Sequence, residues 1–194
     1  NYKKGRFLNG RYKILKVQNE ITKEAEDNTA IEEPLEISIT PGGERKIISI
    51  TMRTPGNDED LAAGFLFTEG IIKNYPSIQS FSTGMNTVTV HTKENAELNL
   101  KSSDRNFYMT SSCGICGKSS IDSVRTNSQY KIEILKNVIS KNVILSLPDA
   151  LRKHQSIFDS TGGLHASGLF DFNGNFIVLK EDVGRHNALD KLAG

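Results

Sequence analysis

Two segments of strictly alternating residues constrain the fold of this chain more than any other feature of its sequence. Residues 35–40 and 48–52 place apolar and polar side chains in turn, a pattern typical of β-strands. Pro41-Gly42-Gly43-Glu44 lies between them and supplies turn-forming residues. We therefore predict a β-hairpin over about residues 34–53.

A helix is predicted to follow this hairpin. Asn57 or Asp58 can cap it, and the acidic residues that come next are favourable in its first turn. Apolar residues then recur at helical spacing to about Thr68, and Gly70 ends the helix. Shorter strands are predicted at residues 12–17, 78–81, 87–91 and 107–109.

A second helix is predicted in the later half of the chain. Residues 126–142 are polar and weakly patterned, which indicates a linker. Ser146-Leu147-Pro148-Asp149 then favours the start of a helix that runs to about Asp159. His154 belongs to the predicted apolar face of this helix.

A hairpin and a final helix complete the predicted elements. Asn173-Gly174 predicts the turn of a hairpin formed by residues 164–172 and 175–180, and residues 182–193 have helical composition. The predicted buried side of this last helix consists of Val183, Leu189 and Leu192. Because strands come first and a helix, a hairpin and a helix follow, the order favours an α+β or mixed α/β fold.

The bulk composition limits the classes of function. The chain has 194 residues, of which 37% are hydrophobic and 24% are charged, as in an ordinary globular protein. A net charge of +1 gives no general electrostatic reason to bind nucleic acid or an anionic membrane. No apolar run approaches the roughly 20 residues of a membrane span. The basic N-terminus lacks the apolar stretch of a signal peptide, so we expect a cytoplasmic protein.

The only two cysteines, Cys113 and Cys116, lie three positions apart in a loop rich in Gly and Ser. A secreted disulfide scaffold would use more cysteines and spread them along the chain. The thiolate is the reactive form of cysteine. Gly114 and Gly117 let backbone amides approach a sulfur atom, and Lys118 adds positive potential. The pair is therefore suited to taking a sulfur atom from a donor persulfide and passing it on.

Other roles for the cysteine pair remain open at this point. Two buried structural cysteines would not ordinarily lie in such a loop, and a thioredoxin-type redox pair lacks the surrounding βαβ pattern. A tetrahedral zinc site would be satisfied by Cys113, Cys116, His165 and His186. The histidines lie in separate segments without an H-x-x-x-H spacing. This spacing counts against a zinc site, but the number and type of ligands fit one, so a zinc-binding structural or hydrolytic domain is kept as an alternative.

Polar side chains collect where the predicted hairpin meets the last helix. Such a strand-to-helix transition can bind an anionic ligand through helix amides. Arg185 offers bidentate contacts to phosphate, His186 titrates near neutral pH, and Asp182 can cap the helix or bind a ribose. Asn187 adds an amide group, and His165 follows a Gly-Gly turn that distinguishes it from an ordinary strand histidine.

The alternative for this segment is a capped helix on the protein surface. Asp182 would then be the N-cap, and the polar face of the helix would be solvated. This alternative is favoured for Asp190 and Lys191.

The sequence resembles the formate dehydrogenase accessory sulfurtransferase family (FdhD) in three motifs. In chain order these are S-S-C-G-I-C-G-K, T-G-G-L-H-A-S-G-L-F and E-D-V-G-R-H-N-A-L-D-K. Two earlier segments agree with the same family, E-E-P-L-E-I-S-I-T and M-R-T-P-G-N-D-E-D-L-A-A-G-F-L-F-T-E-G-I-I. The resemblance covers nearly all of residues 29–193.

The resemblance implies a sulfurtransferase that is required for formate dehydrogenase activity. Members of the family accept persulfide sulfur from a cysteine desulfurase and pass it to the molybdenum of the bis-guanine-dinucleotide cofactor. Cys113 matches the cysteine that carries the persulfide, and Cys116 matches its partner. The residues expected to bind this cofactor are His165, Asp182, Arg185, His186 and Asn187. No intrinsic metal is expected, and a non-enzymatic chaperone that only holds the cofactor is the other alternative.

The resemblance also implies a division of the chain. Residues 1–105 would form a β-rich region with one helix, and residues 106–194 the cysteine loop and part of a cytidine-deaminase-like α/β domain. Deaminase chemistry is not expected, because no Glu lies two residues after His165 and no downstream C-x-x-C occurs. Family members continue past the D-K-L segment. We therefore expect a domain truncated at its C-terminal end, with the apolar side of the last helix exposed or covered by another chain in a homodimer.

Overall fold

The structure is a computed structural model that describes residues 9–100, 107–108 and 139–194. Its largest sheet has five strands in the order β5-β6-β3-β4-β7. β3 (Glu33–Ile39) and β4 (Lys46–Arg53) pair antiparallel around the short 3-10 turn η1 (Pro41–Gly43), which confirms the first predicted hairpin. The other strands of this sheet, which confirm the shorter predicted strands after the first helix, are β5 (Ile78–Gly84), β6 (Thr87–Thr92) and β7 (Phe107–Tyr108).

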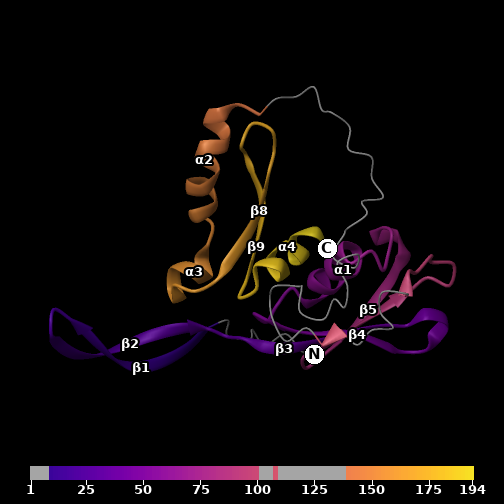
Figure 1. Ribbon diagram of the computed structural model, residues 1–194, viewed down its shortest axis with the longest axis horizontal. Helices are drawn as coiled ribbons and strands as arrows, with labels where there is room; N and C mark the ends of the chain where they lie inside the picture. The colour runs from indigo at the N-terminus through magenta and orange to yellow at the C-terminus, as the bar shows by residue number, and fades with distance from the viewer. Residues whose placement is uncertain (1–8, 101–106, 109–138) are drawn as a thin grey trace.

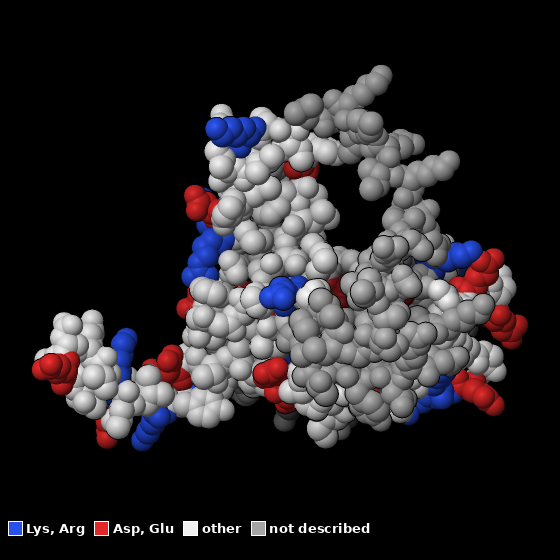
Figure 2. Space-filling model, in the orientation of Figure 1, with Lys and Arg blue, Asp and Glu red and all other residues white. Residues whose placement is uncertain are grey.

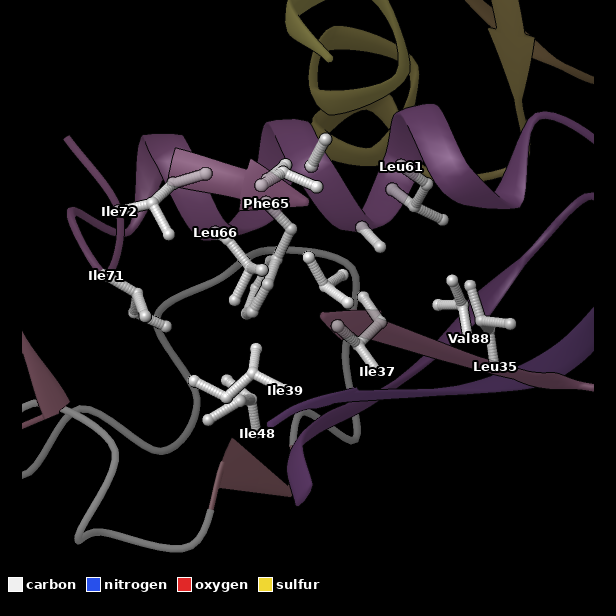
Figure 3. Close-up of a cluster of buried hydrophobic side chains, with 14 residues drawn as sticks. Leu35, Ile37, Ile39, Ile48, Leu61, Phe65, Leu66, Ile71, Ile72 and Val88 are labelled. Atoms are coloured by element: carbon white, nitrogen blue, oxygen red, sulfur yellow. The ribbon is translucent and has the colours of Figure 1, made fainter. Parts of the chain in front are cut away.

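The apolar face of this sheet is covered by α1 (Asp58–Thr68), as Figure 3 shows. Alternation along β3 and β6 directs every second side chain to this face, and these residues are fully buried. The central cluster contains Leu35, Ile37, Ile39, Val88 and Val90 from the sheet and Leu61, Phe65 and Leu66 from the helix. The predicted helix is confirmed at both ends, and Gly70 adopts a positive φ of 67° just beyond it.

Arg53 fixes the start of α1 against the end of β4. Its side chain is fully buried, and its guanidinium donates to both carboxylate oxygens of Asp58 at 2.9 Å. Such a bidentate pair is strong and directional. Asn57 holds the N-cap position, with a φ of 54°, but its side chain makes no capping hydrogen bond. Asn57 thus occupies the predicted cap position without a capping side-chain bond, and Asp58 is held by Arg53 instead of acting as a cap.

A second sheet is a long hairpin of two strands, β1 (Asn9–Gln18) and β2 (Ile21–Ala30). Figure 1 shows that this hairpin extends away from the rest of the structure. The predicted strand at residues 12–17 is confirmed as part of β1. β2 was not predicted, because its sequence, ITKEAEDNTA, is largely polar and has no apolar alternation.

The helical segment after residue 139 differs from its prediction. Two helices occur, α2 (Lys141–Arg152) and α3 (Ser156–Thr161), in place of one helix over 146–159. α2 begins early because the Ser140 side chain accepts a hydrogen bond from the Val143 amide at 3.2 Å, which caps the first turn. Pro148 therefore lies inside the helix rather than at its start. The end of the predicted linker, residues 141–142, is helical, and its residues 126–138 lie outside the described residues.

The last part of the chain forms the predicted hairpin and helix. β8 (His165–Phe170) and β9 (Phe176–Asp182) pair antiparallel, and α4 (Arg185–Ala193) follows. The helix begins three residues later than predicted, because Asp182 is still part of β9 and Gly184 takes the N-cap position. These elements and the five-stranded sheet together confirm a mixed α+β fold. The cytidine-deaminase-like character and the truncation stay predictions.

α4 packs directly across α1. The side of α4 that faces α1 is not the apolar side that was predicted to be buried. The side of α4 that is buried consists of Asn187, Ala188, Asp190 and Lys191. Leu189, which was predicted to be buried, is 51% exposed, and Val183 and Leu192 are only half-buried. The prediction of a buried apolar side was wrong, because the close helix contact buries the opposite side, whereas the exposure of Leu189 agrees with the other expectation, an uncovered apolar side. No helix among the described residues is long and apolar enough to cross a membrane.

Gly64 makes this close contact possible. A Cβ atom at this position would overlap the main-chain carbonyl of Asp190 in α4. The closeness of the two helices therefore depends on the missing side chain.

We expect Gly64→Ala to lower the free energy of unfolding by about 1–3 kcal/mol, the usual cost of overpacking a tight contact. An unconstrained Gly→Ala change inside a helix would instead stabilise the protein by about 0.5–1 kcal/mol. Urea denaturation followed by circular dichroism measures the sign. Glu59→Ala, at an exposed position in the same helix, is the control and should change stability little. A stabilised Gly64→Ala variant would show that α1 and α4 are not in close contact.

Candidate functional site

The predicted polar cluster lies where β9 meets α4, and Asp182 is at its centre. This carboxylate is fully buried. It accepts hydrogen bonds from the main-chain amides of Thr54 at 3.1 Å and Gly184 at 2.8 Å, and from Asn187 Nδ2 at 3.1 Å. A buried carboxylate with this many donors is held in one position. Asp182 therefore joins the β9–α4 turn to the segment that follows β4.

Lys191 completes this buried group of residues. Its ammonium group lies 2.7 Å from Asp182 Oδ2 and donates to the Thr54 carbonyl at 2.7 Å, with only 2% of the side chain exposed. Burial lowers the pKa of Lys191, and the nearby Asp182 carboxylate opposes this change. The predicted solvent-exposed position of Lys191 is thus wrong, because the helix turns this side chain inward to pair with Asp182.

Asn187 makes the remaining contacts between α4 and β4. Its Nδ2 donates to the Met52 carbonyl at 2.7 Å, and its Oδ1 accepts from the Thr51 hydroxyl at 3.4 Å. Asp182 and Asn187 are therefore bonded inside the fold. Their predicted part in cofactor binding stays a prediction, and in this structure they position their neighbours rather than present a surface.

The other three predicted binding residues are exposed. His165 begins β8 and lies directly opposite Asp182 in the strand register, while Arg185 and His186 are the first two residues of α4. Residues directly opposite in an antiparallel pair project to the same face of the sheet. The structure thus brings all five predicted residues to one junction, with the side chains of His165, Arg185 and His186 on its solvent-exposed side.

A cavity of about 420 Å³ adjoins this junction. Its walls come from residues 54–57, from His154, Ser156 and Ile157 at and just before the start of α3, and from residues 176–181 of β9, together with Lys191. The imidazole of His154 stacks on the ring of Phe176, with centroids 3.7 Å apart and planes inclined by 7°. The cavity therefore combines an aromatic pair with polar groups, as small-molecule sites commonly do.

Ion pairs and caps fix the walls of this cavity. Lys180 of β9 pairs with Asp60 of α1. Glu181, a member of the third motif, accepts from the main-chain amides of Ile157 at 3.1 Å and Phe158 at 3.0 Å, so it holds the start of α3 against β9. The sequence had indicated none of these wall residues as functional. His154 in particular was assigned to an apolar helix face, because its packing partner Phe176 lies far away along the chain.

Asp190 was also predicted to be solvated, and it is instead 8% exposed. The Thr68 hydroxyl donates to its carboxylate at 2.8 Å across the α1–α4 contact. Burial raises the pKa of Asp190 to about 6, helped by the carboxylates of Glu69 and Asp182 and opposed by the Thr68 hydrogen bond and by His186.

The structure does not test the two predicted catalytic cysteines. Cys113 and Cys116 lie outside the described residues. Among the described ranges, no group of three or more His, Asp or Glu side chains could hold a metal ion.

The raised pKa of Asp190 predicts a pH-dependent stability. A carboxyl group with a raised pKa binds its proton more tightly in the folded state, so its contribution is complete below about pH 4 and is lost as the pH rises through about 6. We expect Asp190→Asn to remove this dependence and to stabilise the protein at pH 8 by up to about 3 kcal/mol, since one pKa unit corresponds to about 1.4 kcal/mol. Urea denaturation from pH 4 to pH 8 tests this. Glu94→Gln, on the exposed surface, should retain the wild-type pH profile.

Comparison with known proteins identifies the family to which this chain is similar. A sequence model of the FdhD/NarQ family matches residues 30–194, which include all of the site described above. The chain is 42% identical over 195 residues to the sulfur carrier protein FdhD of Streptomyces avermitilis, covering 95% of this chain and 68% of the relative. It is 46% identical over 168 residues to the FdhD of Picrophilus torridus, covering 87% and 63%. The chain thus spans about two thirds of the length of these relatives.

The fold is also similar to that of a crystal structure described as a formate dehydrogenase accessory protein from Desulfotalea psychrophila. The TM-score is 0.70 at 23% sequence identity, and the match covers 96% of this chain and 68% of that one. At this level of identity the likeness concerns the fold. The match over residues 30–194, together with relatives more than 40% identical, shows that this chain belongs to the FdhD/NarQ family.

Proposed function

We propose that this chain carries sulfur as a persulfide on Cys113 and transfers it to the molybdenum cofactor of a formate dehydrogenase. The observation that carries the proposal is the match over residues 30–194 to a family whose curated members are named sulfur carrier proteins. The C-x-x-C loop supplies the chemistry. It contains the only two cysteines in the sequence, and a cysteine thiolate is the nucleophile that this reaction needs.

In the first proposed step, the Cys113 thiolate attacks the outer sulfur of a persulfide on a cysteine desulfurase. The S–S bond of the donor breaks, the donor cysteine leaves as a thiolate, and a new S–S bond forms on Cys113. In the second step this S–S bond breaks and its electron pair returns to Cys113. The sulfur atom bonds to molybdenum, which supplies the two electrons of the new bond. Cys116 is proposed to assist by exchange with Cys113.

The guanine-dinucleotide part of the cofactor is proposed to bind at the β9–α4 junction. Arg185 is the residue best suited to the phosphates, because its planar guanidinium can donate two parallel hydrogen bonds. His165 and His186 are exposed at the same junction and can add hydrogen-bonding groups to its rim. The cavity provides an aromatic wall, the His154–Phe176 pair, that is suited to stacking a purine ring.

A sulfur adduct on Cys113 tests the carrier function directly. After incubation with a cysteine desulfurase and cysteine, mass spectrometry should show a gain of about 32 Da per transferred sulfur atom. Cys113→Ser should lose both this adduct and formate dehydrogenase maturation in cells, whereas Cys116→Ser should keep part of each. A fully active Cys113→Ser variant would exclude the mechanism. Maturation without any adduct would favour the non-enzymatic chaperone, and stoichiometric zinc in the purified protein would favour the zinc alternative.

Binding of guanosine diphosphate separates the two proposed nucleotide contacts. We expect Arg185→Ala to weaken this binding by about 1.5–3 kcal/mol, the usual value of a charged hydrogen bond. Phe176→Ala should weaken it if the purine stacks in the cavity, and Lys93→Ala, at an exposed position in a distant loop, is the control. Isothermal titration calorimetry measures all three. Unchanged affinity in Arg185→Ala would show that this residue belongs to the helix surface only.

A further inference from the structure

Three hydrogen-bonded side chains cross the five-stranded sheet on the face that α1 does not cover. Side chains alternate between the two faces of a strand. Ile39 of β3 and Val90 of β6 are fully buried in the core beneath α1, and Phe81 of β5 packs against the same core. The residues that follow these three along the chain therefore lie on the other face: Thr40, His91 and Ser82.

His91 is at the centre of this group, which we call the Ser–His–Thr cluster. Its Nε2 lies 2.7 Å from Ser82 Oγ on one side, and its Nδ1 lies 3.2 Å from Thr40 Oγ1 on the other. Both are hydrogen-bond distances. The Thr40 amide also donates to the Val90 carbonyl at 3.2 Å, which keeps Thr40 beside β6. The imidazole is therefore held at both ring nitrogens by hydroxyl groups from the two neighbouring segments of the sheet.

The bond between Ser82 and His91 is diagonal across β5 and β6. In the register of these strands the direct partner of His91 is Ser80, and the direct partner of Ser82 is Thr89. Diagonal neighbours in a strand pair are within reach of a large side chain such as an imidazole. The Thr89 hydroxyl lies 2.9 Å from the Ser38 hydroxyl of β3. Because Thr89 is engaged there, Ser82 is left to bond the imidazole.

This arrangement is that of an activated nucleophile. In such a site the nucleophile is bonded to a base, and a third group orients the base. The imidazole takes the hydroxyl proton, and the third group holds the ring in the tautomer that leaves Nε2 without a proton. Thr40 can fill the third place as an acceptor from Nδ1–H of His91. Thr40 is uncharged, so it stabilises an imidazolium less than a carboxylate would, and we expect modest reactivity.

The outer edge of β5 supplies a hydrogen-bond donor beside the nucleophile. β5 is the first strand in the order of the five-stranded sheet, so one of its edges faces away from β6. Gly84 pairs with Thr87 around a two-residue turn, and hydrogen-bonded and non-hydrogen-bonded pairs alternate from this turn onward. The main-chain amide of Thr83 therefore points away from β6. This amide directly follows Ser82, the position that donates to the oxyanion in the α/β-hydrolases.

The surface around Ser82 is open and has little net charge. Ser82 is exposed, while His91 and Thr40 are half-buried beside it. On the same face of the sheet, Arg45 and Glu36 form an ion pair with each other. Figure 2 shows acidic and basic side chains interspersed at the end of the molecule where Figure 1 places β4 and β5. Such a surface fits a small uncharged acyl compound better than a strongly charged one.

We propose that Ser82 is an acyl-transfer site, with His91 as its general base and Thr40 as the residue that positions the imidazole. Ser82 Oγ attacks the carbonyl carbon of a small activated ester or thioester, and its proton passes to His91 Nε2. A bond forms between Oγ and the acyl carbon, the bond to the leaving group breaks, and the imidazolium gives its proton to the leaving group. Water that His91 deprotonates in the same way then releases the acid and restores the Ser82 hydroxyl. The site is separate from the β9–α4 junction, whose Asn187 meets Thr51 on the face of the sheet that α1 covers.

Labelling with an alkyl fluorophosphonate tests the nucleophile, because a reactive serine displaces fluoride and keeps the phosphonyl group. Peptide mass spectrometry of the full 194-residue chain is expected to find the adduct on Ser82. Ser82→Ala should lose this adduct. His91→Gln should slow its formation by at least about tenfold, the low end for loss of a general base because Thr40 is uncharged. Ser80→Ala is the matched control and should label like the wild type, since Ser80 is exposed on the same strand directly opposite His91.

Acetylation by p-nitrophenyl acetate tests acyl transfer itself. An acetyl group is expected on Ser82, and peptide mass spectrometry measures it there because the cysteine thiolates can react with the same ester. The positioning role of Thr40 is tested by a pair of variants. Thr40→Val has a similar shape without the hydroxyl and should slow acetylation of Ser82, whereas Thr40→Ser keeps the hydroxyl and should restore it. Circular dichroism checks that each variant is folded.

Three results would overturn the proposal. The first is the absence of either adduct from Ser82 of the wild-type chain, which would leave the Ser–His–Thr cluster as a cross-strand hydrogen-bond network that only stabilises the sheet. The second is an unchanged rate of labelling in His91→Gln, which would show that His91 is not the base. The third is an unchanged rate of acetylation in Thr40→Val, which would remove Thr40 from the site. None of these results bears on the persulfide adduct of Cys113, so the sulfur carrier function is judged independently.

Discussion

The buried ion pair between Asp182 and Lys191 holds together parts of the chain that lie more than 120 residues apart. Burial of two charges costs several kcal/mol for each ion, and it is offset only when hydrogen bonds satisfy the remaining donors and acceptors. Here the main-chain amide and carbonyl of Thr54 supply those bonds, one to each charge. Loss of either side chain would leave the other as an uncompensated buried charge, so the β4–α1 connection, β9 and α4 depend on the pair jointly.

Within the predicted cluster, some residues hold the fold together and others lie on the protein surface. Asp182 and Asn187 face inward and are bonded to the main chain of residues 52–54, whereas Arg185 and His186 occupy the exposed first turn of the same helix. A helix whose inner side is fixed by several hydrogen bonds can present its outer side chains in a defined geometry. The residues of this motif therefore serve two purposes, support of the fold and presentation of side chains at the surface, and only the second requires contact with a ligand.

Much of the fold could be predicted because its signals are local. Strict alternation determines the β3–β4 hairpin, Asn173-Gly174 determines the β8–β9 turn, and helical spacing determines α1. β2 could not be predicted because neither of its faces is buried, so its sequence carries no apolar alternation. The start of α2 was assigned to Pro148 because a proline is usually an N-terminal signal, and the cap provided by Ser140 was overlooked.

The sequence by itself determined the family, the mixed α+β class and the segments in which polar side chains collect. Motifs and hydrophobic periodicity depend only on residues that are close together along the chain. Only the tertiary structure decided which side of α4 is buried. Gly64 admits the Asp190 main chain, and the buried Asp182 carboxylate takes Lys191 as its partner, so two charged residues enter the interior while Leu189 faces solvent. The physical reason is that burial of a charge depends on a partner, and that partner lies in another segment of the chain.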